Sequence, residues 1–303
     1  MSNETEIKID GKNLALSNLD KILYPKAKFT KGQVVDYYIR AAPVLLPHLK
    51  NRPLTLKRYP NGVEQNFFYE KKCPTFRPAW LQTAPVWSKT NHQKISYCLA
   101  NDLPSLIWAV NLADLEFHTS LARYKKVDQP TVVVFDLDPG PKMDALDCAG
   151  VALGLRAIFE KLNLKCFPKT SGSKGLQLYV PLNTAVTFDE TKNFARAIAQ
   201  NFAARHPGKV VSQMAKKLRP GKIFIDWSQN DNHKTTVCVY SLRAKERPTV
   251  STPLKWSEVE GALKNRSAAK LSFEASDVLK RVEKFGDLFE PVLILKQKLP
   301  NLS

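Results

Sequence analysis

The pattern of apolar and polar positions predicts short strands in the first half of the chain and longer elements in the second. First-half strands are predicted at 54–60, 65–71, 92–100 and 114–122. In the second half, 131–138 is an apolar run that turns abruptly acidic, which is typical of the end of a buried strand. Further strands are predicted at 164–170, 175–182, 222–228 and 235–241.

Helix-start signals place two long helices. Thr30 is followed three positions later by Gln33, and Thr187 by Glu190, which is the spacing of a capping box. These helices are predicted to run to about residue 47 and about residue 206, and 14–25 is predicted to be a short lead-in. Further helices are predicted at 105–113, 144–162, 256–264 and 275–284. Strands and helices do not alternate regularly, so the predicted class is α+β with antiparallel hairpins.

Two turn signals predict hairpins. The dipeptide Asn61–Gly62 separates the first two predicted strands, and Asn-Gly is a strong hairpin signal. The strands 222–228 and 235–241 flank a short polar segment, which predicts a second hairpin.

The charge balance narrows the class of partner. Lysine and arginine number 46 against 28 aspartates and glutamates, a formal net charge of +18. No apolar run approaches the ~18 residues of a membrane span, and the polar N-terminus resembles neither a signal nor a transit peptide. A basic surplus without a membrane anchor favours a polyanion such as nucleic acid, the alternative being a merely basic cytosolic enzyme. We therefore expect a cytoplasmic, nucleoid-associated protein with no membrane partner.

The cysteines point to the same compartment. There are 5 of them, scattered along the chain without a C-x-x-C pair. This argues against a disulfide framework and against a cysteine-type zinc site, and it favours a reducing cytosol.

Three aspartates occupy apolar settings. Asp136 and Asp138 end the strand 131–138 and project from the same face, while Asp226 interrupts the strand 222–228. Two carboxylates ~4 Å apart repel by roughly 4 kcal/mol at an effective dielectric constant near 20. A raised pKa, a basic partner or a divalent cation relieves such repulsion, and oxygen ligands suit Mg²⁺ or Mn²⁺. In a basic protein this arrangement indicates chemistry on phosphates, and a solvated strand end is the alternative.

A second motif offers groups for the phosphates themselves. The turn 170–175 carries hydroxyls, glycines and Lys174, which together make a phosphate cradle, although its spacing is not that of a P-loop and an ordinary turn is the alternative. Gln229 and Asn230 follow Asp226 closely. Arg243 ends the last predicted strand, where its guanidinium suits bidentate binding of a triphosphate.

The first hairpin combines basic and aromatic residues. Lys57 and Arg58 lie on one strand, and Phe67, Phe68 and Tyr69 on the other, which is typical of sites that stack bases and hold the backbone. Because neighbours on a strand face opposite ways, at least one of Phe67 and Phe68 is predicted to lie in the core.

An ordered set of segments from about Leu16 to about Leu288 resembles a known family. The segments are LSNLDKILYP, RPLTLKRYPNGV, FFYEK, VVVFDLDPG, TSGSKGLQLYVPL, GKIFIDWSQN and YSLR. They resemble the polymerase domain of bacterial non-homologous end-joining ligases, within the archaeo-eukaryotic primase superfamily. The resemblance implies a primase-type catalytic core of mixed and antiparallel β-sheets flanked by helices, forming a single domain over 1–303. Within it, about 14–122 would be the β-rich, DNA-contacting part and about 123–290 the catalytic part.

The same resemblance implies an activity and roles for residues. The activity is template-dependent nucleotidyl transfer to DNA 3′-ends, with a preference for ribonucleotides over deoxyribonucleotides, in gap filling and end processing during double-strand break repair. Catalysis and a two-metal site for Mn²⁺ or Mg²⁺ would fall to Asp136, Asp138 and Asp226. The incoming nucleotide would be surrounded by Ser171, Lys174, Gln177, Arg243, Lys57, His118 and Gln229. A pocket for the 5′-phosphate of gapped or 3′-overhang DNA would comprise Asn18, Lys21 and Lys31. Further DNA contacts would come from Phe68 and Tyr69, and from Arg219 near the primer end.

One position departs from the family pattern. The second family motif usually ends in histidine, and this chain has Gln177 there. Glutamine donates a hydrogen bond to a phosphate but carries no charge. We therefore expect the chemistry to be retained and the nucleotide affinity to change.

Three alternatives were weighed. The segment FDLD is similar to the nucleophile motif of haloacid-dehalogenase phosphatases, but it is central in the chain and followed by Pro-Gly. Lys8–Gly11 spells a ligase adenylation motif without the later ligase motifs, so it is taken as coincidental. The non-enzymatic alternative is a module that only binds DNA ends with a 5′-phosphate. Since the chain ends after the polymerase-like region, Ku and a separate DNA ligase are the expected partners.

Overall fold

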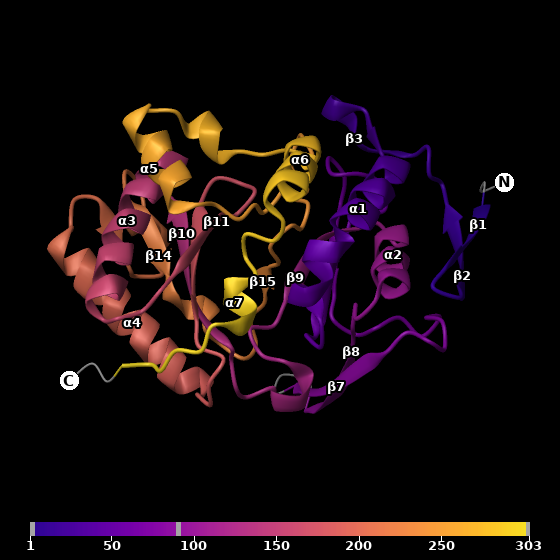
Figure 1. Ribbon diagram of the computed structural model, residues 1–303, viewed down its shortest axis with the longest axis horizontal. Helices are drawn as coiled ribbons and strands as arrows, with labels where there is room; N and C mark the ends of the chain where they lie inside the picture. Colours follow the sequence, from indigo (N-terminus) through magenta and orange to yellow (C-terminus); the bar gives the residue numbers. More distant parts are fainter. Residues whose placement is uncertain (1–3, 89–91, 301–303) are drawn as a thin grey trace. The chain divides into compact units, whose positions relative to one another are not determined.

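The computed structural model describes residues 4–88 and 92–300, which form two compact units (Figure 1). Unit 1 comprises residues 1–125, 235–250 and 274–286, and unit 2 comprises 126–234, 251–273 and 287–303. Two segments of the second half of the chain, 235–250 and 274–286, therefore fold with the N-terminal part. Each unit has its own sheet, and the α+β class is confirmed.

Unit 1 is built on a four-stranded antiparallel sheet in the order β15-β9-β5-β6. The strands are β15 (Thr236–Val237), β9 (Asp114–Thr119), β5 (Leu54–Arg58) and β6 (Phe68–Glu70). Its helices are α1 (Lys31–Leu49), α2 (Leu103–Asn111) and α6 (Ala275–Phe285), and both α2 and α6 pack against α1. Three two-stranded ribbons complete the unit: β1 (Glu4–Ile9) with β2 (Lys12–Ser17), β3 (Ile22–Tyr24) with β4 (Phe29–Thr30), and β7 (Thr83–Ser88) with β8 (Gln93–Cys98).

The two faces of this sheet differ in chemistry. Successive side chains on a strand point to opposite faces. On β9, Leu115 and Phe117 are buried, and Phe117 meets Tyr38 of α1 edge to face at 5.1 Å between ring centroids. The alternate residues, Glu116 and His118, therefore occupy the opposite face.

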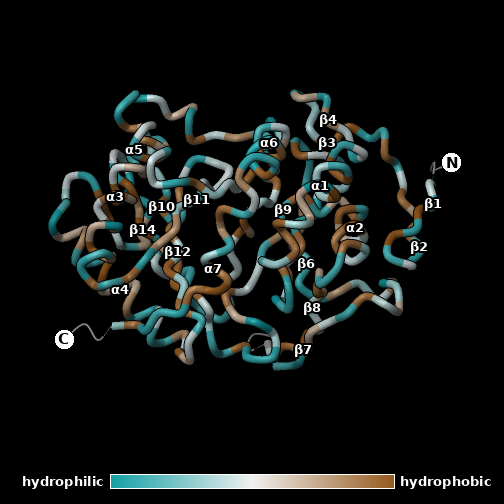
Figure 2. Tube along the Cα trace, viewed as in Figure 1, coloured by the Kyte–Doolittle hydropathy of each residue, from teal (hydrophilic) through white to brown (hydrophobic). Residues whose placement is uncertain are grey.

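Unit 2 contains a five-stranded sheet in the order β11-β12-β10-β14-β13. The strands are β11 (Phe167–Thr170), β12 (Leu176–Pro181), β10 (Val132–Pro139), β14 (Ile223–Asp226) and β13 (Val210–Val211), and only the last pair is parallel. The helices are α3 (Ala145–Lys161), α4 (Phe188–Arg205), α5 (Trp256–Lys264) and the short α7 (Pro291–Ile294). The hydrophobic residues of β12 are visible in Figure 2.

The core of unit 2 lies between this sheet and its long helices. Val133, Phe135 and Leu137 of β10 are buried against residues of α3 and α4, such as Ala152 and Ala199. Since these odd-numbered residues face the helices, the even-numbered residues of β10 project from the other face. That alternation places Asp136 and Asp138 away from the helical layer.

Most predicted helices and strands are confirmed, and their ends differ from the predicted ones by about four residues at most. Both predicted capping boxes are present, at Thr30 and Thr187, and the first hairpin forms between β5 and β6. The lead-in 14–25 is wrong in part, because most of it belongs to strands β2 and β3. The hairpin predicted between 222–228 and 235–241 is also wrong. Strand β14 pairs with β10 in unit 2 and β15 pairs with β9 in unit 1, because each apolar strand finds a longer partner far away in sequence.

The cysteine prediction also needs correction. Cys73 and Cys98 form a disulfide in unit 1, although the sequence argued against a disulfide framework. Local pairing brings them together, since the backbone N–H of Cys73 donates to the carbonyl of Ser96 at 2.7 Å. Cys148, Cys166 and Cys238 are buried thiols outside this disulfide. In the described ranges, no helix combines the length and apolarity that crossing a bilayer requires.

Candidate active site

A row of polar side chains crosses the sheet of unit 2 at a single level. Register places Lys169 of β11 opposite Gln177 of β12, Gln177 opposite Asp136 of β10, and Asp136 opposite Asp226 of β14. Cross-strand partners share a face, so these four side chains all lie on the face opposite the helices, together with Asp138. Strand register therefore places Asp226 beside Asp136, and its role in the reaction stays a prediction.

The environment of Asp136 is that of a carboxylate short of positive charge. Burial, and then repulsion from Asp138 and Asp226, raises its pKa to about 7. A hydrogen bond from Gln177 and the charge of Lys169 act in the opposite direction but do not restore the ordinary value. The ammonium of Lys169 is itself fully buried and donates to Ser251 Oγ at 2.6 Å. A divalent cation would relieve the remaining repulsion, so the donor chemistry of the pair fits Mg²⁺ or Mn²⁺.

Asp226 is held differently. Its Oδ1 accepts from the backbone N–H of Ser228 at 2.9 Å and from the Ser228 hydroxyl, and its Oδ2 accepts from Gln229 Nε2 at 3.0 Å. Within the described ranges, no group of three His, Cys, Asp or Glu side chains is arranged to hold a metal ion. The first ligands of the cation would be Asp136 and Asp138, and Oδ2 of Asp226, which accepts one hydrogen bond, keeps a second lone pair with which it would join them.

Asn230, which follows Gln229 in sequence, has a structural role that the sequence analysis did not predict, because it ties the segment after Asp226 to β10. Its buried side chain accepts from the backbone N–H of Val134 at 2.8 Å and donates to the Val134 carbonyl at 2.7 Å. The amide thus continues the pairing of β10 beyond the end of β14. No sequence signal distinguishes this asparagine from an ordinary turn residue.

The hydroxyl- and glycine-rich turn forms as predicted between β11 and β12. Ser171 Oγ accepts from the backbone N–H groups of Ser173 and Gly175, both at 3.2 Å, while Lys174 is exposed. Gly175 is required for packing, because a Cβ there would lie 2.1 Å from the Leu137 carbonyl oxygen. The turn therefore packs closely against β10, the strand that carries Asp136 and Asp138.

Gln177 is buried and hydrogen-bonded to Asp136, while its Oε1 has no hydrogen-bond partner. The side chain of Gln177 therefore hydrogen-bonds to a carboxylate and is shielded from solvent. Its nucleotide-binding role remains a prediction.

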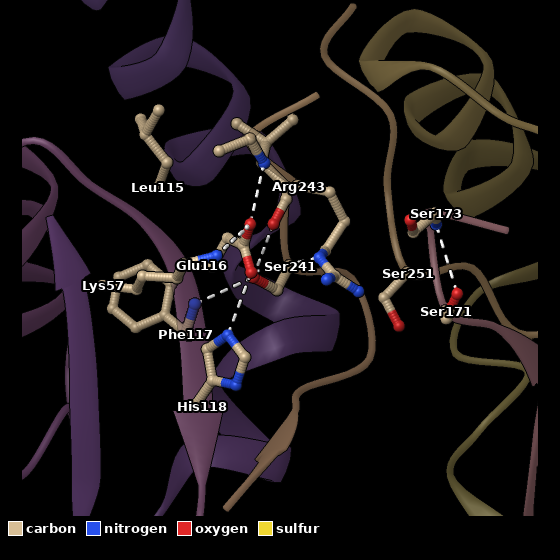
Figure 3. A network of polar contacts seen from close by, with 12 residues as sticks. Lys57, Leu115, Glu116, Phe117, His118, Ser171, Ser173, Ser241, Arg243 and Ser251 are labelled. Carbon is tan, nitrogen blue, oxygen red and sulfur yellow. Dashed lines mark hydrogen bonds and ion pairs between the residues drawn. The ribbon is translucent and has the colours of Figure 1, made fainter. Parts of the chain in front are cut away.

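Three of the residues predicted to bind the nucleotide meet in unit 1. Lys57, His118 and Arg243 all contact the buried carboxylate of Glu116 (Figure 3). The distances are 3.3 Å from Lys57 Nζ, 3.0 Å from His118 Nε2 and 3.1 Å from Arg243 Nε. Sequence reasoning missed Glu116, because a single glutamate in an alternating strand carries no recognisable signal.

The aromatic residues of the first hairpin are exposed. Phe67, Phe68 and Tyr69 are 48%, 44% and 57% exposed, so the prediction that Phe67 or Phe68 lies in the core is wrong. The physical reason is that β6 is a three-residue edge strand. There, the Phe67 ring stacks on Tyr59 at 5.2 Å, and the Arg58 guanidinium lies over the Phe68 ring.

The residues predicted to bind a 5′-phosphate include two neighbouring lysines. Lys31 Nζ donates to the Ser17 carbonyl at 2.6 Å and to Asn111 Oδ1 at 2.8 Å. Burial, and then the charge of Lys21, lowers the pKa of Lys31 to about 8. Lys21 is exposed and its backbone N–H donates to the carbonyl of Asn18, so all three lie in one region of unit 1.

Arg219 lies in the loop before β14, as predicted. Its guanidinium packs over the ring of Phe224 at 3.8 Å and donates to the Met214 carbonyl at 2.9 Å. Phe224 pairs with Asp138, so Arg219 belongs to the aspartate face of the sheet.

A cavity of about 440 Å³ lies on the other face of the same sheet. Apolar residues such as Val151 and Ile223 line it, with His206 and Lys209 among its polar residues. Ile223 points away from the aspartates, because it alternates with Phe224 along β14. The cavity is therefore separate from the aspartate row.

Comparison with known proteins identifies the family. Residues 30–289 match the family model described as "LigD, primase-polymerase domain". The "Multifunctional non-homologous end joining protein LigD" of Mycolicibacterium smegmatis is 39% identical over 279 residues, covering 91% of this chain and 36% of that protein. The "Bifunctional non-homologous end joining protein LigD" of Bacillus subtilis is 34% identical over 274 residues, covering 90% of this chain and 43% of that protein.

A solved structure agrees. The structure described as "Polymerase Domain from Mycobacterium tuberculosis Ligase D in complex with DNA" matches with a TM-score of 0.86 and 36% identity, covering 94% of this chain and 99% of that one. The chain spans about a third of the length of the mycobacterial relatives, the part that corresponds to this domain. The order of motifs, the aspartate row and these matches lead to one conclusion: the chain belongs to the LigD primase-polymerase domain family.

Proposed function

We propose that this protein is a nucleotidyltransferase that adds nucleotides, preferentially ribonucleotides, to DNA 3′-ends during non-homologous end joining. The observation that carries the proposal is the aspartate row, in which Asp136 and Asp138 share the face of the sheet that points away from the helices, with Asp226 opposite Asp136. Family membership supports the reaction class, and the net charge of +18 supports a nucleic-acid substrate.

The chain's own residues divide the work. Asp136 and Asp138, with Asp226, would hold Mg²⁺ or Mn²⁺, which when bound supplies charge stabilisation at the reacting phosphate. The primer 3′-oxygen forms a bond to the α-phosphorus, its proton leaves, and the bond to pyrophosphate breaks. Lys57, His118 and Arg243 offset the negative charge of the triphosphate, and Ser171 and Lys174 contribute hydroxyl and ammonium donors. Gln229 and Gln177 orient Asp226 and Asp136 through the hydrogen bonds described above.

DNA would be bound by other surfaces. Exposed Phe68 and Tyr69 offer rings on which bases stack, and Arg219 would steady the primer end. Asn18, Lys21 and Lys31 would bind a 5′-phosphate. We further propose that Ku and a separate ligase act with this protein near the nucleoid, and that its substrates are gapped or 3′-overhang ends.

Primer extension across a short gap tests the proposal. The assay compares NTP with dNTP, Mn²⁺ with Mg²⁺, and a 5′-phosphorylated with an unphosphorylated downstream strand. We expect template-directed incorporation that is strongest with NTP and a 5′-phosphate. Tight binding to phosphorylated gaps without any incorporation would instead support the non-catalytic end-binding module.

A further inference from the structure

Glu116 is a buried acid to which the proposed reaction assigns no direct role. Its side chain is 1% exposed, and it lies on β9 at the polar face of the unit 1 sheet. Both carboxylate oxygens are engaged, and the Tyr59 side chain also hydrogen-bonds to the carboxylate. Oε1 accepts from Lys57 Nζ at 3.3 Å and from the backbone N–H of Ala244 at 3.0 Å, and Oε2 contacts His118 Nε2 and Arg243 Nε. With both oxygens engaged and shielded, Glu116 is not available to contact a substrate.

The charge of Glu116 is strongly stabilised. Burial alone would raise its pKa, but the hydrogen bond from His118 and the charges of Arg243, His118 and Lys57 outweigh burial. The pKa therefore lies well below its usual range, and the carboxylate is ionised at neutral pH. Without this anion, the basic side chains of Lys57 and Arg243 would be held together with an imidazole in a buried place, where like charges repel strongly.

Further contacts, together with those to Glu116, fix the positions of Lys57 and Arg243. Lys57 Nζ also lies over the rings of Tyr59, Phe67 and Tyr69, at 5.3, 4.5 and 5.6 Å from their centroids. The backbone beside Arg243 is held from two sides, by the Ala244 N–H on Glu116 and by the Tyr24 hydroxyl, which donates to the Arg243 carbonyl at 3.1 Å. Figure 3 shows the three basic side chains converging on the single carboxylate.

We propose that Glu116 is a positioning residue, which sets Lys57, His118 and Arg243 in advance into one array that binds the triphosphate of the nucleotide. This inference rests on the proposed function, in which those three residues bind the nucleotide. One carboxylate against Lys57 and Arg243 leaves the array positive, so it still attracts a polyanion while avoiding the cost of unscreened cations. Preorganisation of this kind strengthens binding because less order is lost when the ligand arrives.

The test is Glu116→Gln, which keeps an acceptor for the Ala244 N–H and removes the charge. We expect KM for ribonucleoside triphosphate to rise at least about tenfold, with a smaller effect on kcat, since a buried charge pair is broken. Calorimetry with inorganic triphosphate in the absence of metal should show a matching loss of affinity. The preference for a 5′-phosphorylated over an unphosphorylated gap should stay unchanged, because the contacts of Glu116 do not involve the proposed 5′-phosphate residues Asn18, Lys21 and Lys31.

Two further variants keep the test decisive if Glu116→Gln folds poorly. Glu116→Asp keeps the charge on a shorter side chain, so its KM should lie between those of the wild type and Glu116→Gln. Glu283→Gln removes the charge of an exposed ion pair with Arg40, 3.0 Å apart in the same unit, and should leave KM unchanged. A wild-type KM and triphosphate affinity in both Glu116 variants would overturn the inference. A wild-type protein that neither incorporates nucleotides nor binds triphosphate would overturn the proposed function instead.

Discussion

The two polar clusters, one in each unit, compensate charge in opposite ways. In unit 1 a single buried anion, Glu116, is surrounded by basic groups, and its pKa is held well below the usual range. In unit 2 a buried carboxylate, Asp136, has two acidic neighbours and only one buried lysine in its row, and its pKa rises to about 7. The first cluster is electrostatically satisfied by the chain alone. The second is not, which is typical of a site that a cation completes.

The difference predicts that removing charge has opposite effects on stability in the two clusters. Neutralising Glu116 removes the anion that Lys57 and Arg243 share and should destabilise the fold. Neutralising one aspartate of the row relieves repulsion and should stabilise it. Functional sites commonly hold such unfavourable arrangements at the expense of stability.

The largest expected effect is on catalysis in Asp136→Asn or Asp138→Asn. Each should lower gap-filling activity more than about a hundredfold. Even the loss of a residue that only hydrogen-bonds to a metal ligand lowers activity or metal affinity about 10- to 100-fold, and a direct ligand should matter more. The metal-free melting temperature should rise, by about 2–4 °C for each kcal/mol of repulsion removed. Extension assays and calorimetry measure the two effects, with Asp189→Asn, at an exposed carboxylate of α4, as the control. Unchanged activity in both variants would remove these aspartates from the reaction.

A second prediction concerns Lys169, the buried cation of the row. Lys169→Met should reduce the free energy of unfolding of the metal-free protein by about 3–5 kcal/mol, because the aspartates lose their compensating charge. Added Mn²⁺ should recover part of the loss, since the cation takes over that charge. The matched control is Lys192→Met, at a half-exposed pair with Asp231, which should cost about 1 kcal/mol or less. Equal losses in the two variants, measured by denaturant titration, would mean that Lys169 does not serve the carboxylates.

A third prediction concerns the attachment of β14 to β10. Asn230→Ala should lower the free energy of unfolding by about 2–4 kcal/mol, because it leaves a buried N–H and a buried carbonyl of Val134 without their partner. Activity should fall as well, since Asp226 loses its fixed position. The comparison variant is Asn232→Ala, at an exposed position in the same loop, where little change is expected. Denaturant unfolding followed by circular dichroism distinguishes them.

The sequence predicted those features that depend on local pattern. Capping residues gave the starts of α1 and α4, and alternation along β10 placed Asp136 and Asp138 on one face. The sequence did not predict pairing between distant strands. Two neighbouring apolar segments such as β14 and β15 fit a hairpin equally well, and only the structure shows that their partners are β10 and β9. Glu116 itself, and the structural role of Asn230, were not predicted for the same reason. Their importance comes from what surrounds them in space, and neither has a neighbour in sequence that signals it.

The smallest expected effect concerns a third cluster, Lys21 and Lys31 near Asn18, and it is a change with pH in the preference for a 5′-phosphate. The pKa of Lys31 is lowered to about 8, so this ammonium is cationic below that pH and loses its charge above it. A 5′-phosphate is already largely dianionic at pH 7, so a change between pH 7 and 9 reports the lysine. Preference for a 5′-phosphorylated gap over an unphosphorylated one should therefore fall about two- to fivefold across that range. Lys31→Arg should abolish this pH dependence, because arginine stays protonated. A preference that falls equally in the variant would assign the effect to another group and leave Lys31 without a part in phosphate binding.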